Sequence, residues 1–307
     1  MLKSELKSHL YTTLHWFGSC LGVVGIIFMV VKLIDYKSQL HPEALLKADW
    51  LGIFLLTSLY GIAGLLLARA WRFLLIYLGV AVSSGWAVWA YGVSQLAKYV
   101  PGNIFHLAGR QALGAAAGLP NWPLVKSTAW ELTLQVIAGA IVSILVLPLI
   151  ITTISPMVSL FVFTIVLLAT LVLFYYFFNS QFLLAFCWYF LFLIVGSSIF
   201  SAMAFYISSD ELSLTIIPII ASGYALAWLI GLLTPGAPAG IGVREFILYS
   251  LLERFFNSAD LLTIIVVSRM MTVAGDFIFY LIAGFIFKSR RNDKFFTNQN
   301  LVRTELS

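Results

Sequence analysis

The chain has 307 residues, of which 61% are hydrophobic and 10% charged, with a mean hydropathy of +0.99. Soluble globular proteins carry about 25% charged residues, so this composition excludes a soluble enzyme or carrier and indicates an integral membrane protein. Much of the formal net charge of +5 comes from a basic cluster near the C-terminus, which is typical of a topology signal and not of a nucleic-acid site.

Apolar segments of about 20 residues, long enough to cross a bilayer, recur along the chain. The first of them, 14–34, is too long for the apolar core of a signal peptide, so we expect it to be retained. The predicted fold class is an all-α polytopic membrane protein with about eight transmembrane helices. The predicted spans are 14–34, 51–70, 76–97, 127–150, 156–178, 182–207, 213–233 and 261–287.

Positive charges favour the cytoplasmic side of a membrane. Lys3 and Lys7 precede the first predicted span, Arg69 and Arg72 follow the second, and a basic tail at 288–307 follows the last. Eight spans bring all three groups to one side. We therefore expect a multi-pass protein of the inner (plasma) membrane with both termini in the cytoplasm.

Two intervals between predicted spans, 98–126 and 234–260, do not read as ordinary loops. Both are expected on the outer side, and each opens with Pro-Gly and then reaches an arginine, at positions 134 residues apart: Pro101, Gly102 and Arg110 in the first, and Pro235, Gly236 and Arg244 in the second. The match predicts a single membrane domain, 1–307, built from two four-span repeats, 14–150 and 156–287. An even number of spans in each makes these repeats parallel; the alternative is coincidence, since Pro and Gly are common at span ends.

Each interval is predicted to contain a re-entrant segment, 98–120 in the first and 234–250 in the second. Residues 103–118, NIFHLAGRQALGAAAG, contain no helix breaker, and a helix of that length rises about 24 Å. That is too short and too polar to span, and too apolar for a solvated loop. Such backbone is tolerated at membrane depth only inside protein or beside a watery cavity. In the second segment Gly236, Gly240 and Gly242 allow tight turns.

Four ionisable residues stand within or beside predicted spans: Glu131, Glu245, Arg269 and Asp276. A charge at mid-membrane costs about 2.5–3.5 kcal/mol on insertion scales, so each is expected to face a partner or a cavity. Arg269 and Asp276 are seven residues apart and share one helix face. We expect these four to balance charge or line a pathway; the alternative is that Glu131 pairs with an arginine only to hold two helices together.

Arg110 and Arg244 each stand near the start of a short helix in a broken segment. Helix N-termini and the fork of an arginine both favour phosphate or carboxylate. His106 lies one turn before Arg110 on the same face, and Asn103 opens that segment. We predict these four residues as a lipid phosphate site, and we expect no catalytic residue, metal or cofactor.

KYVPGNIFHLAGR (98–110) and TPGAPAGIGVRE (234–245) together resemble the flippase-like membrane family, also called the lysylphosphatidylglycerol synthase transmembrane-region family. Members carry a Tyr-Ile/Val-Pro-Gly-Asn segment ending in Gly-Arg, and a Pro-Gly-rich segment ending in Gly-Val-Arg-Glu. The resemblance extends over about residues 10–290; Ala239 departs from it, because a glycine is usual there. Members that aminoacylate lipids have a fused soluble domain, which is absent here.

The resemblance implies translocation of an anionic phospholipid, or of a polyprenyl-phosphate-linked sugar, across the inner membrane in cell-envelope biogenesis. No Walker motif is present, so nucleotide hydrolysis is not expected. Two alternatives remain open. One is a membrane transferase acting on a lipid headgroup, with Glu131, His106 and Glu245 as candidate acids and bases. The other is a scaffold that positions a glycosyltransferase or lipid-modifying partner.

Overall fold

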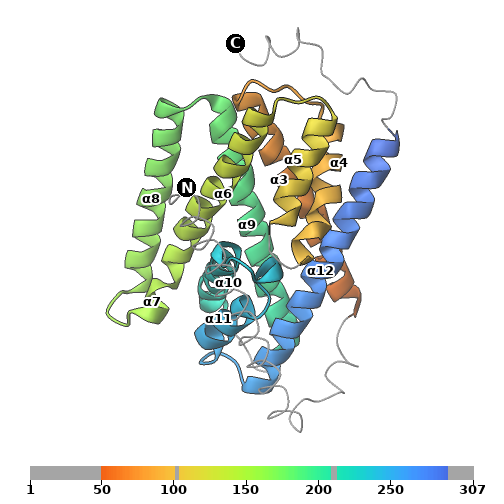
Figure 1. Cartoon of the computed structure of the whole chain (residues 1–307). Coiled ribbons are helices and arrows are strands. Elements are labelled where there is room, and N and C mark those ends of the chain that lie inside the picture. The colour runs from red at the N-terminus through yellow and green to blue at the C-terminus, as the bar shows by residue number, and fades with distance from the viewer. Residues whose placement is uncertain (1–49, 101–103, 209–212, 290–307) are drawn as a thin grey trace, which may run out of the picture.

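The computed structural model describes residues 50–100, 104–208 and 213–289, and within these ranges every regular element is a helix (Figure 1). Pro101, Gly102 and Asn103, the predicted span 14–34 and residues 290–307 of the predicted tail lie outside the described residues. The elements in chain order are α3 (Trp50–Tyr77), α4 (Ser84–Gln95), η1 (Leu96–Tyr99), α5 (Phe105–Ala116), α6 (Asn121–Ser143), η2 (Ile144–Val146), α7 (Leu147–Ile150), α8 (Pro156–Phe177), α9 (Ser180–Ile207), η3 (Leu214–Ile216), α10 (Ile217–Leu233), η4 (Pro238–Gly240), α11 (Val243–Leu252) and α12 (Ser258–Ser289).

Five helices in the described ranges are long and apolar enough to cross a membrane: 50–77, 121–150, 156–177, 180–207 and 258–286. At 1.5 Å per residue they rise about 33 to 45 Å, which matches or exceeds the ~30 Å hydrocarbon core of a bilayer. The all-helical class expected from composition is confirmed. The count of eight spans is not.

Two of the predicted spans, 76–97 and 213–233, take a different form. α3 runs on to Tyr77, and the chain turns at Gly79, whose φ is +80°, before α4 begins. α4 has 12 residues and α10 has 17, so they rise only about 18 and 26 Å. Hydropathy does not separate a complete span from a buried partial one, because both are apolar.

α4, η1 and α5 form a first hairpin, which enters the bundle from the end where α12 finishes. α4 descends antiparallel to α12, so that Gly92 packs against Ala283 and, lower down, Lys98 of η1 pairs with Asp276. α5 then returns, and Gly114 near its end faces the start of α6. The hairpin therefore begins and ends at the upper end of the bundle in Figure 1.

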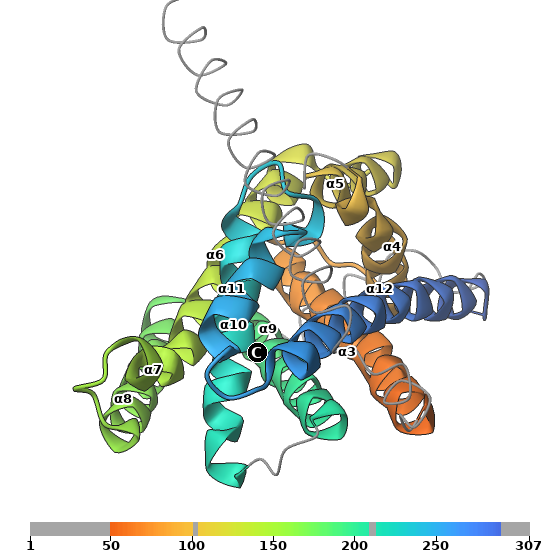
Figure 2. The same ribbon diagram turned by 90° about the horizontal axis from the view of Figure 1, so that it is seen from below.

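α10, η4 and α11 form a second hairpin, which enters from the opposite end. Gly223 near the start of α10 packs against Leu252 at the end of α11. Arg254, which follows α11, donates a hydrogen bond of 3.4 Å to the carbonyl oxygen of Leu149 in α7, at the lower end of the bundle. Figure 2 shows α10 and α11 side by side, seen from that end. The two hairpin tips, η1 and η4, contact each other inside the bundle.

This arrangement corrects the predicted placement of both Pro-Gly intervals on one side, and with it the expected parallel relation. A shift of 134 residues brings α3, α4, α5 and α6 onto positions that overlap α9, α10, α11 and α12. The packing corresponds as well, because α3 lies along α9, α4 packs on α12 and α10 packs on α6. A single crossing, α8, separates the two sets, so the second set runs inverted with respect to the first. The four-span parallel repeats are not confirmed.

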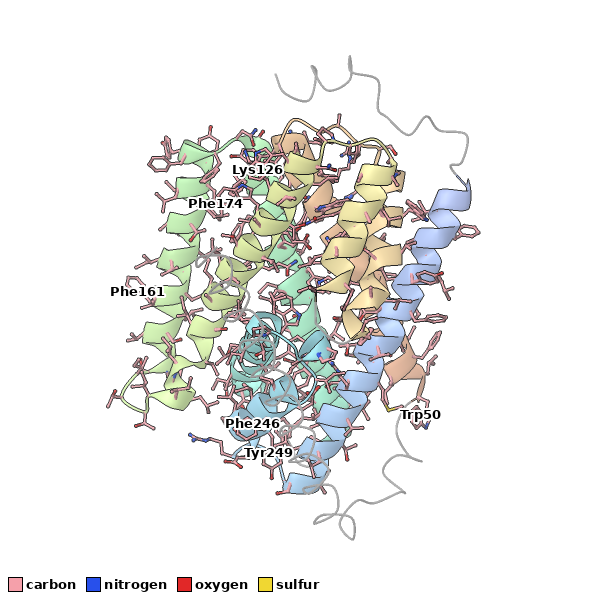
Figure 3. All side chains as sticks on the ribbon, in the orientation of Figure 1. Trp50, Lys126, Phe161, Phe174, Phe246 and Tyr249 are labelled. Atoms are coloured by element: carbon pink, nitrogen blue, oxygen red, sulfur yellow. The ribbon has the colours of Figure 1, made fainter. Side chains whose placement is uncertain are left out.

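The outer surface of the bundle is apolar and the interior is closely packed (Figure 3). On α8, 15 of the 22 side chains are exposed and only Ser159 is buried, and Phe161 points away from the bundle. Phe174 on the same helix instead packs edge-on against Phe182 and Phe186 of α9, with centroid distances of 5.2 and 5.1 Å. An apolar exterior of this kind suits contact with lipid chains and not with water.

Candidate functional site: a polar cavity between the hairpin tips

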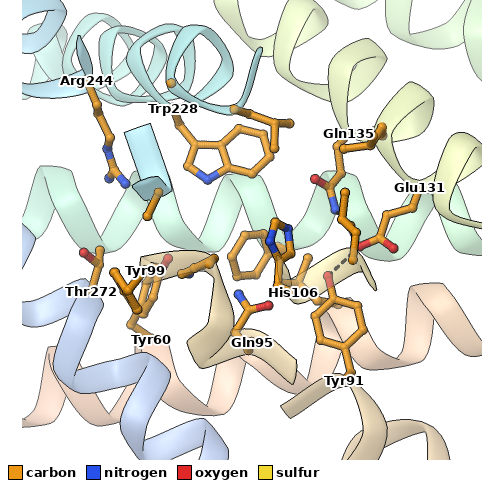
Figure 4. A pocket seen from close by; sticks show the side chains of 18 of the residues that line it. Tyr60, Tyr91, Gln95, Tyr99, His106, Glu131, Gln135, Trp228, Arg244 and Thr272 are labelled. Atoms are coloured by element: carbon orange, nitrogen blue, oxygen red, sulfur yellow. Dashed lines mark hydrogen bonds between the residues drawn. The ribbon is translucent and has the colours of Figure 1, made fainter. Parts of the chain in front are cut away.

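A polar cavity of about 80 Å³ lies where the two hairpin tips meet (Figure 4). The first hairpin contributes part of the wall, the second hairpin contributes another, and α3, α6, α9 and α12 complete it. The polar and aromatic side chains around it are Tyr60, Tyr91, Gln95, Lys98, Tyr99, His106, Glu131, Gln135, Phe192, Trp228, Arg244, Arg269 and Thr272. A concave site with a few convergent polar groups, set among apolar helices, is the usual form of a small-ligand site.

Glu131 of α6 is tied into the wall by three donors. Nη1 of Arg110 reaches its two carboxylate oxygens at 2.9 and 2.7 Å, the Tyr91 hydroxyl donates at 2.7 Å, and the Gln135 amide donates at 3.3 Å. Glu131 is 1% exposed and Arg110 is 2% exposed. This contact joins the first hairpin to α6. It fits the alternative stated above, in which Glu131 pairs with an arginine to hold two helices together.

Arg110 stands behind the cavity wall and does not line it. Its guanidinium lies over the Tyr91 ring at 3.9 Å and near the Trp71 ring at 5.6 Å. Nε and Nη2 have no hydrogen-bond acceptor in the described residues, so these N–H groups face aromatic surface. The expectation that both arginines approach one cavity is therefore met by Arg244 alone.

Arg244 is the second residue of α11 and is 6% exposed. Its side chain extends into the cavity near Thr272 and Tyr60 (Figure 4), and its guanidinium lies 4.4 Å from the centroid of the Tyr224 ring. Among the described residues no carboxylate forms a salt bridge with it. A buried cation without such a partner is unfavourable, and this one is placed to receive an anion through its planar fork.

Glycine makes the turn that carries Arg244 into the cavity. Gly236, Gly240 and Gly242 have φ values of +86°, +71° and +85°, which glycine adopts without steric cost. A Cβ built on Gly240 would lie 2.8 Å from the Cα of Gly231, so α10 and η4 approach through backbone. Ala239, where the resembling family has glycine, also adopts a left-handed conformation, with φ +48°. The turning role expected for the described glycines agrees with their geometry.

Glu245 has two structural partners. Its Oε2 accepts a 2.6 Å hydrogen bond from the backbone N–H of Gly242, which caps α11, and its Oε1 lies 3.4 Å from Nε of Arg269. Arg269 in turn donates to the carbonyl oxygen of Ala239 at 3.0 Å. The second hairpin is therefore fastened to α12 at its tip.

Asp276, the other charged residue on this face of α12, fastens the first hairpin. It lies 2.6 Å from Nζ of Lys98 and accepts a hydrogen bond from the Tyr99 hydroxyl. Neither Lys98 nor Tyr99 was singled out as a site residue from the sequence. Both belong to the KYVPGN segment, which immediately precedes the first short helix.

His106 lines the cavity between the Arg244 end and the Glu131 end (Figure 4). Its Nδ1 is buried and has no hydrogen-bond partner in the described residues. Tyr60, Gln95 and Thr272 also line the cavity and were not predicted, because uncharged polar residues in an apolar helix carry little sequence signal. In the described ranges no three His, Cys, Asp or Glu side chains gather as metal ligands would.

Comparison with known proteins adds no relative. No protein-family model matches the chain, and no curated protein matches it. The family resemblance of the two Pro-Gly segments is therefore a proposal.

Proposed function

We propose that this protein translocates an anionic phospholipid, or a polyprenyl-phosphate-linked lipid, across the inner membrane during cell-envelope biogenesis. The headgroup phosphate binds in the cavity between the hairpin tips, and the lipid chains stay in the apolar surroundings. The observation that carries the proposal is Arg244, a buried cation that lines the cavity and has no carboxylate partner in the described residues.

The opposed hairpins support transport over simple binding. Each covers the cavity from one end of the bundle, and their tips, η1 and η4, meet beside it. Broken helices that place half-helix ends at a central site are a recurring feature of transporters with inverted halves. A rearrangement of either hairpin would expose the same site to one side of the membrane.

The contacts of the two glutamates disfavour the transferase alternative. A general base needs a free carboxylate within reach of the proton that it removes. Glu131 is held by Arg110, Tyr91 and Gln135, and Glu245 by Gly242 and Arg269. These carboxylates are engaged in structural contacts, whereas Arg244 forms no salt bridge with a carboxylate in the described residues.

Transport by the purified protein separates translocase from scaffold. The protein is reconstituted alone in liposomes that contain a trace of phosphatidylglycerol with a fluorescent label on its acyl chain. Dithionite is then added, and it bleaches the label in the leaflet that it can reach. We expect wild type to make the inner-leaflet label accessible and Arg244→Gln to lose most of that activity. Arg254→Gln removes an arginine outside the cavity and serves as the matched control. Equal bleaching in wild-type and protein-free liposomes, or in wild type and Arg244→Gln, contradicts the proposal.

A further inference from the structure

We infer that the cavity accepts a headgroup with a single negative charge, a phosphodiester monoanion, and discriminates against a phosphomonoester dianion. The inference rests on the proposed function and narrows its substrate class. It comes from the pairing of the charges around the cavity.

In the described part of the chain, seven charged side chains line or border the cavity, and six of them form three closed pairs. The pairs are Lys98 with Asp276 at 2.6 Å, Arg110 with Glu131 at 2.7 Å, and Arg269 with Glu245 at 3.4 Å. Arg244 is the seventh. The described surroundings of the cavity therefore hold one uncompensated positive charge.

Each pair is also held by hydrogen bonds that keep it closed. Tyr99 donates to Asp276, Tyr91 and Gln135 donate to Glu131, and the Gly242 N–H donates to Glu245. To free a second cation for a ligand would leave a carboxylate buried without its counter-charge, which is strongly unfavourable. The free charge thus stays on Arg244.

The remaining polar lining is uncharged. Tyr60, Gln95 and Thr272 offer hydroxyl and amide groups, which bind a phosphate oxygen without balancing its charge. The Nδ1 of His106 is buried, and burial, together with the nearby cations Arg110 and Lys98, disfavours a positive charge on its ring, so we count it as neutral. A dianion would bring one negative charge that nothing here compensates, close to the paired carboxylates.

Short-chain lipids test the charge preference directly. Dihexanoyl-phosphatidylglycerol is a diester with one charge, and dihexanoyl-phosphatidic acid is a monoester that loses its second proton near pH 6. Binding of both to the purified full-length protein is measured by titration calorimetry at about pH 8 and at about pH 5.5. At the higher pH we expect the diester to bind at least about tenfold more tightly than the monoester. The difference should narrow at the lower pH, where the monoester carries one charge.

A variant that adds one free cation provides a gain-of-binding test. Asp276→Asn releases Lys98, which lines the cavity, and should shift the preference toward phosphatidic acid at about pH 8. Glu253→Gln removes an exposed carboxylate and is the matched control. Elution of each variant as a single symmetric peak in detergent shows that it is folded, and the comparison of the two lipids on wild type needs no variant.

The outcomes separate the two proposals. If phosphatidic acid binds wild type as tightly as the diester at the higher pH, and Arg244→Gln weakens both, the phosphate site stands and the single-charge rule is wrong. If Arg244→Gln leaves both affinities unchanged, the phosphate site itself is wrong, and the proposed function fails with it.

Discussion

Arg269 and Asp276 lie two turns apart on one face of α12 and hold different hairpins. Arg269 pairs with Glu245 of the second hairpin, and Asp276 pairs with Lys98 of the first. One helix thus fastens both tips beside the cavity through charges of opposite sign. If the protein transports a lipid as proposed, movement of either hairpin away from α12 would open one of these two pairs.

Removal of one partner from the Lys98–Asp276 pair should cost more stability than removal of both. Asp276→Asn leaves the largely buried Lys98 ammonium without a counter-charge, and we expect a loss of about 1–3 kcal/mol. The double variant Lys98→Met with Asp276→Asn removes the orphan charge and should recover part of that loss. Thermal unfolding in detergent measures both, with Glu253→Gln as control. A double variant that is less stable than the single one would contradict a closed ion pair.

Arg110 and Arg244 should separate folding from binding. Arg110→Met leaves Glu131 buried and uncompensated, with an expected loss of about 3–5 kcal/mol, and adding Glu131→Gln should restore much of it. Arg244→Gln removes no ion pair, so stability should stay near that of wild type while lipid binding is lost. Unfolding and calorimetry on the same preparations check this. Arg110→Met with wild-type stability would show that the Arg110–Glu131 contact contributes nothing to the fold.

Gly240 should not tolerate even the single methyl group of alanine. Gly240→Ala places Cβ 2.8 Å from the Cα of Gly231 and forces an L-residue to φ +71°, at a cost of about 1–3 kcal/mol. The tip of the second hairpin should shift, and transport should fall. Gly284→Ala on α12 meets no atom within 4 Å and is the matched control. The two variants are compared by melting temperature and by the liposome assay. Equal melting temperatures and equal transport would contradict the claim that the close approach of α10 and η4 requires glycine at position 240.

The opposed hairpins predict opposite accessibility at their outer ends. Asn121→Cys and Glu253→Cys both replace exposed residues, the first just after the first hairpin and the second just after the second. In a background without Cys20 and Cys187, an impermeant maleimide added to intact cells should label only one of them, and lysis should allow labelling of both. Labelling of both in intact cells would restore the arrangement with the two Pro-Gly segments on one side.

Composition and motif spacing alone predicted the all-helical membrane class, the positions of the two Pro-Gly segments and the charged residues that need a partner. Long apolar segments commit α3, α6, α8, α9 and α12 to helices, because a backbone in lipid has to satisfy its own hydrogen bonds. The matched Pro-Gly-to-arginine spacing identified the two places where the chain breaks. Charged residues in apolar segments can also be recognised in the sequence, because the free-energy cost of burying a charge implies a partner. Such partners are found for Glu131, Glu245, Arg269 and Asp276.

The pairing of those charges was decided only by the tertiary structure. Arg110 and Arg244 have the same local sequence setting, yet one is neutralised by Glu131 and the other faces the cavity. Which carboxylate reaches which arginine depends on the direction from which each hairpin enters. That direction depends on whether an apolar segment crosses the bilayer or turns back, and hydropathy is the same for both. Long-range packing, such as Gly92 on Ala283 and Gly231 on Gly240, sets the depth of each hairpin and thereby leaves Arg244 as the free charge.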